Sequence, residues 1–267
     1  MNSEHPQVST ALQTGDELGL KHLALIMDGN GRWAEAQGEA RSAGHARGAE
    51  VVREVVRRAH ELGLEYLTLF AFSTLNFGRP SEEVQALMEL LKAYLSAELP
   101  ELIERKIRLK VIGELEFLPR ELREQIAEVE RLTRREGPVM TLTLAVSYDG
   151  RRDVVRATRH LVQLARRGEL LPADVGEDTL IGALSTAETP EVDLLIRTSG
   201  ERRLSGFLPL EACYAELIFL EKPWPDFTPR DLDEALAAFA QRQRRFGLTD
   251  AQLAQSLAHP ELSSSPS

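Results

Sequence analysis

The chain has 267 residues, 43% of them hydrophobic, so it can bury a full core in one large domain or two small ones, and we favour one. Its formal net charge of −10 argues against a general nucleic-acid binder, whose surface would be basic, so any phosphate site must be a local basic pocket. The single cysteine, Cys213, excludes an internal disulfide, fits a reducing cytoplasm and is expected to be a small buried apolar group.

The two ends of the chain are polar and contain serine and proline. We expect tails at 1–19 and 251–267 around one domain at 20–250. The N-terminus lacks the basic start and apolar core of a signal peptide. No stretch reaches the roughly 18 uninterrupted apolar residues that a membrane span requires. These features predict a soluble, cytoplasmic protein with at most peripheral membrane contact.

The first predicted strand, 22–28, leads into a cluster of chemically active groups. Its apolar run, Leu23–Met27, has no polar alternation, as in a strand that is covered on both faces of a parallel sheet. Asp28 follows at the carboxyl end, the edge where open α/β sheets bind ligands. Gly29 and Gly31 permit positive φ angles and leave room for a ligand to approach the backbone.

The groups after Asp28 suit an anion. Asn30, Arg32 and backbone N–H groups can face a phosphate, above all if a helix begins here, and more cations follow at Arg41 and His45. A carboxylate among phosphate donors indicates Mg²⁺, which proteins usually hold with one or two carboxylates and substrate phosphates. Taken alone, Asp-Gly-Asn-Gly is equally consistent with an ordinary turn, and the cations after it favour a site.

Further strand-like runs alternate with helical patterns along the chain. The runs are 65–73, 107–113, 138–147, 192–198 and 215–221. The helical patterns cover 48–62, 81–106, 119–135, 150–168, 176–187 and 228–246. This alternation predicts a single α/β domain with a mostly parallel six-stranded sheet and helices on both faces. The apolar positions of 84–95 belong either to the core or to the lining of a hydrocarbon tunnel.

Two later strand ends also carry polar groups. The segment 72–80 holds hydroxyls, an amide and an arginine, and is either a lid over a ligand or an ordinary loop. Arg197 lies at the tip of a buried strand, and its planar guanidinium suits bidentate phosphate binding. Glu216, next to an apolar run, is a strand-edge surface residue unless it pairs with Asp28 on a metal. The sequence contains no Gly-x-x-x-x-Gly-Lys phosphate loop.

Over about residues 20–247, these motifs closely resemble the cis-prenyltransferases, the undecaprenyl diphosphate synthase family. They are Met27-Asp-Gly-Asn-Gly-Arg-Trp33-Ala34, Arg41-Ser-Ala-Gly-His45, Phe72-Ser-Thr-x-Asn76-x-x-Arg79-Pro80, Asp193-Leu-Leu-Ile-Arg-Thr-Ser-Gly-Glu201-x-Arg203-Leu-Ser205-x-Phe207, Tyr214-Ala-Glu216-Leu and Trp224-Pro-Asp226-Phe227. The resemblance implies a homodimer that condenses isopentenyl diphosphate with an allylic diphosphate in the presence of Mg²⁺, forming a Z double bond and releasing diphosphate.

The resemblance also implies roles by position. Asp28 would be the central acid, with Asn76 and His45 beside it in catalysis, and Glu216 would complete the metal site. The groups that would hold the allylic diphosphate or contact the substrates near it are Gly29, Asn30, Gly31, Arg32, Trp33, Arg41, His45 and Arg79. Isopentenyl diphosphate would be held by Arg197, Arg203 and Ser205. The reacting groups would be positioned by Phe72, Ser73, Asn76 and Phe77, under a mobile lid that includes Glu83.

Several positions depart from the family's usual pattern. Leu75 and Phe77 stand where the family has glutamate and tryptophan, and Met140 stands where long-chain relatives tend to carry leucine on the tunnel floor. These departures leave three possibilities: a polyprenyl synthase, a short-chain or irregular coupling enzyme, and a non-catalytic partner subunit. Such subunits tend to lose the Asp-Gly-Asn-Gly-Arg loop, which this chain keeps.

Overall fold

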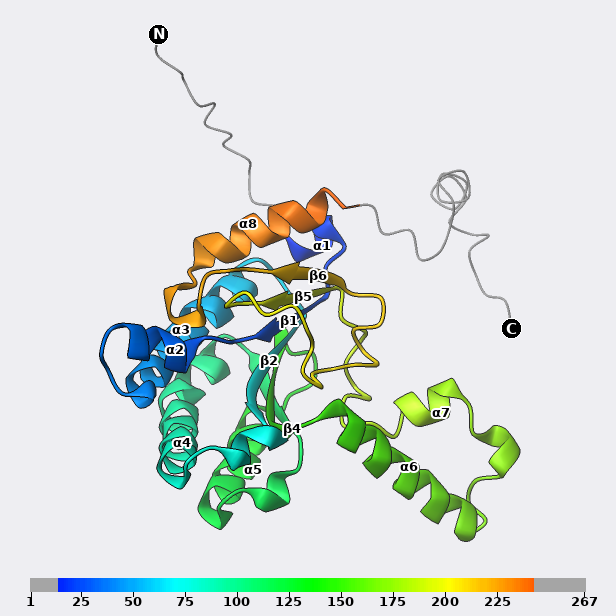
Figure 1. Cartoon of the computed structure of the whole chain (residues 1–267). Helices are drawn as coiled ribbons and strands as arrows, with labels where there is room; N and C mark the ends of the chain where they lie inside the picture. Colours follow the sequence, from blue (N-terminus) through cyan, green and yellow to red (C-terminus); the bar gives the residue numbers. More distant parts are fainter. Residues whose placement is uncertain (1–13, 243–267) are drawn as a thin grey trace.

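The computed structural model of the chain describes residues 14–242, which are arranged around one six-stranded sheet (Figure 1). Residues 251–267 of the expected C-terminal tail lie outside the described part. Within residues 14–19 of the expected N-terminal tail, a capping box between Thr14 and Glu17 begins the short helix α1, Gly15–Leu18.

Every strand predicted from the sequence is present, and all neighbouring strands pair in parallel. The strands are β1 His22–Ile26, β2 Tyr66–Ser73, β3 Ile107–Ile112, β4 Met140–Tyr148, β5 Leu194–Arg197 and β6 Glu216–Phe219. Their order in the sheet is β3-β4-β2-β1-β5-β6. In the centre, Ile26 is level with Phe70 on one side and Arg197 on the other. The carboxyl ends of β1, β2 and β5 therefore meet at one edge, as the parallel arrangement predicts.

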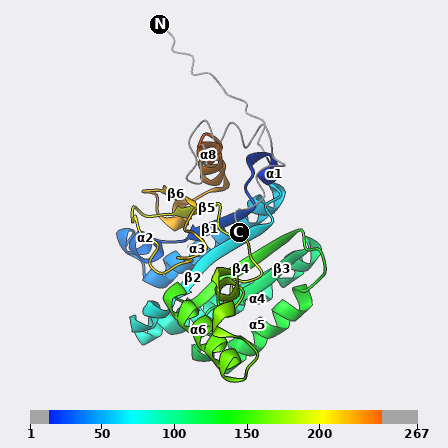
Figure 2. The ribbon, with the colours of Figure 1, turned by 90° about the vertical axis from the view of Figure 1, so that its right-hand side faces the viewer.

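The helices divide into a layer on the sheet and a projecting lobe. They are α2 Asn30–Ala36, α3 Arg41–Glu61, α4 Ser81–Glu104, α5 Arg120–Thr133, α6 Gly150–Arg166, α7 Glu177–Ile181 and α8 Pro229–Ala240. The apolar faces of α3, α4, α5 and α8 share one core with the sheet. The opposite face is covered by the irregular segment 204–215, with Phe207 and Leu208 at its centre. The α6–α7 lobe extends away from the sheet (Figure 1), and it lies in front of the sheet when that side faces the viewer (Figure 2).

Three helices differ from the sequence-based expectation. α3 begins at Arg41, seven residues or almost two turns before the expected start at 48. The helix expected over 176–187 ends at Ile181, because the side chains of Ser185 and Thr186 hydrogen-bond to Asp153 and Glu211 outside the helix. The last helix was expected over 228–246; α8 ends at Ala240, and 243–246 lie outside the described residues.

No helix within residues 14–242 combines the length and the apolar character needed to cross a membrane.

His22 fixes the start of β1 through two buried hydrogen bonds. Its Nδ1 lies 2.8 Å from the Pro190 carbonyl oxygen and its Nε2 lies 2.8 Å from the Thr68 hydroxyl. A carbonyl only accepts, so Nδ1 carries the hydrogen and Nε2 accepts from Thr68. Burial lowers the pKa of His22 below 6.5, against smaller opposing effects of Pro190 and Asp193, so the folded protein keeps this ring neutral.

We expect the free energy of unfolding to fall as the pH drops below about 6.5, because the unfolded chain takes up a proton at His22 before the folded chain does. The slope from this one group reaches at most about 1.4 kcal/mol per pH unit. His22→Asn lacks this titration, so its unfolding should depend less on pH. Urea-unfolding midpoints of both proteins between neutral and mildly acidic pH measure this, and equal slopes would contradict the assignment.

Candidate active site

The loop that follows β1 is held in one conformation by its neighbours. Gly29 has a φ of 98°, which favours glycine, and caps the N-terminus of α2. A Cβ atom on Gly29 would lie 2.6 Å from the Ser199 hydroxyl oxygen, so a larger residue does not fit. The Asp28 N–H donates to the Thr198 hydroxyl at 3.0 Å, and that hydroxyl donates to the Asp28 carbonyl at 2.8 Å. β5 thus positions the loop of β1.

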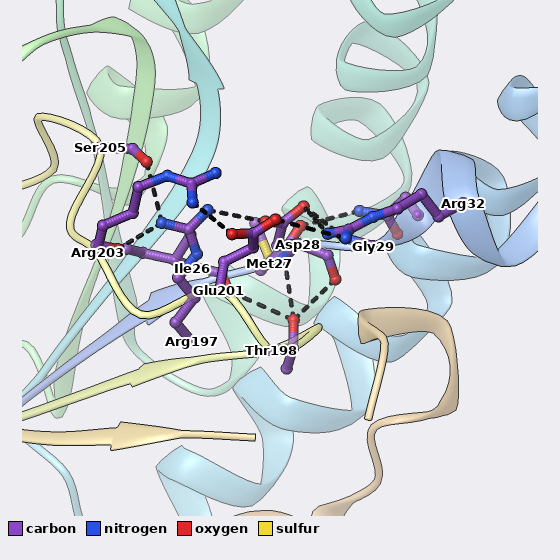
Figure 3. A network of polar contacts seen from close by, with 11 residues as sticks. Ile26, Met27, Asp28, Gly29, Arg32, Arg197, Thr198, Glu201, Arg203 and Ser205 are labelled. Carbon is purple, nitrogen blue, oxygen red and sulfur yellow. Dashed lines mark hydrogen bonds and ion pairs between the residues drawn. The ribbon is translucent and has the colours of Figure 1, made fainter. Parts of the chain in front are cut away.

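Asp28 and Arg197 form the centre of the site (Figure 3). Arg197 Nη2 donates to Asp28 Oδ2 at 2.8 Å, and the Gly29 N–H donates to Oδ1 at 2.7 Å. Arg32 Nη2 lies 3.3 Å from the same Oδ1. Arg197 is only 4% exposed and also donates to Ser205 Oγ at 2.9 Å and to the Arg203 carbonyl. A buried arginine therefore joins the ends of β1 and β5 to the loop beyond β5.

The charges around Asp28 keep its carboxylate ionised. Partial burial raises the pKa of Asp28, but the hydrogen bonds from Arg197 and the Gly29 N–H and the charges of Arg197 and Arg32 outweigh it. The pKa of Asp28 therefore lies below its ordinary value of 3.8. A charged carboxylate is available at this sheet edge at neutral pH.

A second cluster forms around Glu83 near the N-terminus of α4. The Glu83 carboxylate accepts from Arg41 Nε at 3.2 Å and from Arg79 Nη1 at 3.1 Å. His45 Nε2 lies 3.6 Å from its Oε1. Burial, with the charges of Arg79 and Arg41, lowers the pKa of His45 against the opposing effect of Glu83. His45 is therefore neutral at neutral pH, and Glu83 faces two guanidinium cations.

Glu83→Gln is expected to bind inorganic diphosphate about three- to tenfold more tightly than the wild type, because Glu83 competes with the anion for Arg41 and Arg79. Isothermal titration calorimetry measures the two affinities. Glu82→Gln is the matched control, since Glu82 is exposed on the same helical turn and should leave the affinity unchanged. Weaker binding by Glu83→Gln would instead mean that Glu83 holds the arginines in place for the anion.

One cavity of about 380 Å³ connects both clusters. Its polar lining includes Asp28, Arg32, Arg41, His45, Ser73, Asn76, Arg79, Arg197 and Ser205. Its apolar lining includes Val52 from α3, Leu69, Phe70, Phe72 and Leu144 from the sheet, and Leu87, Met88, Leu91 and Tyr94 from α4. The cavity thus combines a charged region that suits an anion with walls that suit a hydrocarbon.

The segment after β2 forms a short 3₁₀ helix, Thr74–Gly78, beside this cavity. Asn76 Oδ1 accepts from the Ser73 N–H at 2.9 Å, and Ser73 Oγ accepts from the Leu75 N–H at 3.2 Å. The Phe77 ring packs edge-on against Phe72, with 4.9 Å between their centroids. The segment predicted as a lid therefore has a defined fold, with Ser73 and Asn76 facing the cavity.

Most predicted site residues gather around the cavity, and some do not. Gly29, Asn30 and Gly31 line it, and the Asn30 amide donates to the Met27 carbonyl at 3.0 Å. Trp33 lies outside the lining, and its indole N–H donates to Asp226 at 2.8 Å. Phe77 contacts Phe72 behind the lining, and the exposed Arg203 side chain pairs with Glu201.

Glu216 is not brought to Asp28 within the chain. It begins β6 and is level with Leu194, whereas Asp28 follows the carboxyl end of β1, near Arg197. Glu216 is thus level with Leu23 of β1, five positions before Asp28, and the strand from Leu194 to Arg197 alone spans about 10 Å. Glu216 pairs instead with Arg242 at 2.5 Å. The predicted strand 215–221 already had Glu216 at its amino end, which in a parallel sheet is the end opposite to Asp28.

Two further residues were misjudged or missed from the sequence. Cys213 is exposed, so the expectation of a buried apolar group was wrong; its thiol donates to the Pro209 carbonyl at 3.2 Å. Thr198 was missed, although its hydroxyl holds the Asp28 backbone. Its place directly after Arg197, at a strand end, was the available signal.

The donor set fits a hard divalent cation that is held together with a ligand's phosphates. Within residues 14–242, no three His, Cys, Asp or Glu side chains form a group that could hold a metal alone. Asp28 offers an ionised carboxylate among arginines that suit phosphates. Mg²⁺ typically takes one or two carboxylates and completes its shell with phosphate oxygens and water.

Comparisons with known proteins agree with these features. A family model described as putative undecaprenyl diphosphate synthase matches residues 26–247. An isoprenyl transferase of Chlorobaculum tepidum is 46% identical over 233 residues, covering 87% of this chain and 88% of the relative. A ditrans,polycis-undecaprenyl-diphosphate synthase of Aliivibrio fischeri, described as (2E,6E)-farnesyl-diphosphate specific, is 45% identical over 87% of this chain and 90% of its own.

Two solved structures share the fold and the sequence. Lavandulyl diphosphate synthase from Lavandula x intermedia, in complex with dimethylallyl diphosphate, matches with a TM-score of 0.83 and 37% identity over 87% of this chain and all 100% of its own. A probable undecaprenyl diphosphate synthase from Campylobacter jejuni matches with a TM-score of 0.70 and 32% identity over 85% of this chain and 98% of its own.

Proposed function

The chain belongs to the undecaprenyl diphosphate synthase family of prenyltransferases, and from this premise we propose that it condenses isopentenyl diphosphate with an allylic diphosphate to give a Z-prenyl diphosphate. The observation that carries the proposal is the Asp28–Arg197 pair at the polar part of a cavity whose other walls are apolar. The reaction needs both regions, because each substrate joins a diphosphate to a hydrocarbon.

The allylic diphosphate binds, in this proposal, at the start of α2. The Asn30–Arg32 turn and Arg41 supply backbone N–H groups and guanidinium donors, and Arg79 and His45 lie nearby. The hydrocarbon tail lies along the apolar walls. Neutral His45 hydrogen-bonds without adding charge, since its pKa lies below 6.5.

Isopentenyl diphosphate binds beside it at the end of β5. Arg197 and Ser205 are already linked to each other, and Arg203 joins them by turning its exposed side chain from Glu201. The Arg197 Nε–H is buried without a protein acceptor, which favours a ligand oxygen as its partner. Asn76 and Ser73 orient the reacting carbons between the two diphosphates.

The bond between the allylic carbon and its diphosphate oxygen breaks as the bond to the terminal carbon of isopentenyl diphosphate forms, so negative charge develops on the departing diphosphate. The isopentenyl unit then loses a proton, which the departing diphosphate accepts, and the fixed arginines stabilise the developing charge where water is excluded. Mg²⁺, held by Asp28 and substrate phosphates, would supply further charge stabilisation there. The ionised Asp28 keeps Arg197 oriented throughout. Glu216 takes no part in this site within one chain, because its carboxylate is at the other end of the sheet.

A second candidate reaction stays within the family. The match to a lavandulyl diphosphate synthase, together with Leu75 and Phe77 in the segment after β2, favours a short-chain or irregular coupling as the alternative. Labelled isopentenyl diphosphate, incubated with dimethylallyl, geranyl or farnesyl diphosphate and Mg²⁺, separates the two. Long Z-products support the main proposal, a branched or short product supports the alternative, and no product from any primer would contradict both.

We further propose that two copies of the chain form a homodimer through the α6–α7 lobe. α6 buries Ala157 and Leu161, while Val155 and Val162 are 47% and 53% exposed. The two valines are seven residues apart, so they share one face of the helix. An exposed apolar face on a projecting lobe suits a second copy. Light scattering of the purified protein tests this, and a monomer at micromolar concentration would contradict it.

A further inference from the structure

The apolar part of the cavity runs between α3 and α4 and ends at one place. The last lining residues on the two helices are Val52 and Tyr94. Along α4, Glu83 at the polar end and Tyr94 at the far end are eleven positions apart, which corresponds to about 16 Å of helix. The apolar wall that α3 and α4 offer to a hydrocarbon entering from the polar end is therefore limited in length.

An ion pair between a partly exposed arginine and a buried carboxylate lies directly beyond this end. Arg53 follows Val52 on α3, and Glu98 lies one turn after Tyr94 on α4. Arg53 donates to Glu98 Oε1 through Nε at 2.7 Å and Nη2 at 2.6 Å. Glu98 is only 6% exposed. The pair joins the two helices where the apolar lining ends.

Tyr94 stands between the cavity and the ion pair. Burial and the charge of Glu98 raise the pKa of the Tyr94 phenol, with the charge of Arg53 opposing, so the ring lies beside both charges and stays neutral. Its ring belongs to the lining, and its neighbours on the same helix face, Leu87 and Leu91, are apolar. The apolar stripe of α4 thus changes to a polar group at Tyr94.

We propose that Tyr94, backed by the Arg53–Glu98 pair, is the residue that limits the length of hydrocarbon the cavity accepts, and hence the length of the product. A chain that grew past Tyr94 would have to displace its ring and then separate the buried Glu98 carboxylate from Arg53, and a buried carboxylate without its partner costs far more than a displaced apolar group. The proposal rests on the proposed prenyl transfer for its product-length consequence, whereas the end of the cavity can be tested without turnover.

The turnover experiment compares product lengths. Tyr94→Ala is expected to lengthen the main product by one to two isoprene units, with the KM for isopentenyl diphosphate within about twofold of the wild type, since Tyr94 is far from the diphosphate groups. Tyr94→Phe keeps the ring and should keep the wild-type length. An unchanged product in Tyr94→Ala, or a longer product in Tyr94→Phe, would overturn the assignment to the ring.

A binding experiment tests where the cavity ends without any prenyl transfer. For a series of n-alkyl phosphates, calorimetry should show affinity rising roughly fourfold with each added methylene until the tail reaches Tyr94, and then levelling off. In Tyr94→Ala the levelling should occur at a longer tail. Equal levelling points would overturn the proposal. A shifted levelling point in a protein that transfers no prenyl group would reject the proposed function and keep this inference.

Two controls accompany these experiments, one for the folding of the variants and one for a change elsewhere on the same two helices. Thermal unfolding identifies a Tyr94→Ala protein that is not folded, in which case Tyr94→Leu, which keeps more apolar volume, is measured with the same expected direction. The Arg57–Glu101 pair links the same two helices without touching the cavity, with an Arg57 Nη2 to Glu101 distance of 2.6 Å. Replacing Arg57 by methionine should therefore leave both product length and the levelling point unchanged, and a shift equal to that of Tyr94→Ala would overturn the proposal.

Discussion

Asp28→Ala is expected to lower kcat for prenyl transfer by about 10³-fold, the effect of removing a preorganised charge from the centre of a site. The carboxylate is the acceptor for Arg197 Nη2 and the Gly29 N–H, and it is the acid proposed to hold Mg²⁺. Its loss removes the metal's protein ligand and releases the arginine that orients the second diphosphate. Initial rates with labelled isopentenyl diphosphate at saturating Mg²⁺ measure the effect.

The controls separate catalysis from folding. Asp28→Ala leaves the charge of Arg197 buried without its partner, so its melting temperature should also fall. Asp28→Asn keeps the shape and an acceptor for Arg197, and it should lose activity while staying nearer the wild-type stability. Asp174→Ala, at an exposed position distant from the cavity lining, should keep wild-type rates. Activity of Asp28→Ala close to that of the wild type would refute the central assignment.

Arg197→Met is expected to lower kcat/KM for isopentenyl diphosphate by about 10²–10³-fold, the range for truncating one partner of a buried, hydrogen-bonded charge pair. Methionine fills similar space but cannot donate to Asp28, to Ser205 or to a diphosphate. Steady-state kinetics with the allylic substrate held at saturation give the value.

Two further variants make this result interpretable. Arg197→Lys keeps the charge and loses the planar fork, so it should recover only part of the activity. Arg230→Met removes an exposed arginine of α8 that pairs with Glu234, and it should change kcat/KM by less than about twofold. An Arg197→Met enzyme with an unchanged KM and an unchanged kcat would show that the second diphosphate binds elsewhere.

The sheet could be predicted because its strands are short apolar runs with clear boundaries. All five residues of β1 and all nine of β4 are buried, and the threonines that alternate with apolar residues at the start of β4 are themselves typical of strands. The ends of the helices were harder to predict, because hydrogen bonds to residues elsewhere in the fold determine where a helix ends. Ser185 and Thr186, whose side chains bond to Asp153 and Glu211, show this where the expected helix over 176–187 ends early.

The candidate site could be predicted where the polar groups follow a strand's carboxyl end. Asp28 and Arg197 meet because β1 and β5 are neighbours, which the motifs at their ends suggested. Glu216 was joined to Asp28 only by the resemblance, although the predicted strand 215–221 has Glu216 at its amino end, which in a parallel sheet lies away from Asp28, and the pairing register agrees. Tyr94 carried no motif, and only the helix packing reveals that its ring ends the cavity.

The contact between Asp28 and Arg197 spans 169 positions of the chain, and it has a consequence for how the molecule matures. α3, α4 and the first strands leave the ribosome long before β5, so the apolar walls exist before the charged end of the cavity is complete. Contacts of such sequence separation form late, because a long loop must close first. During refolding, helix content should therefore return before enzymatic activity, and until β5 docks beside β1 the apolar walls are surfaces that a chaperone would recognise.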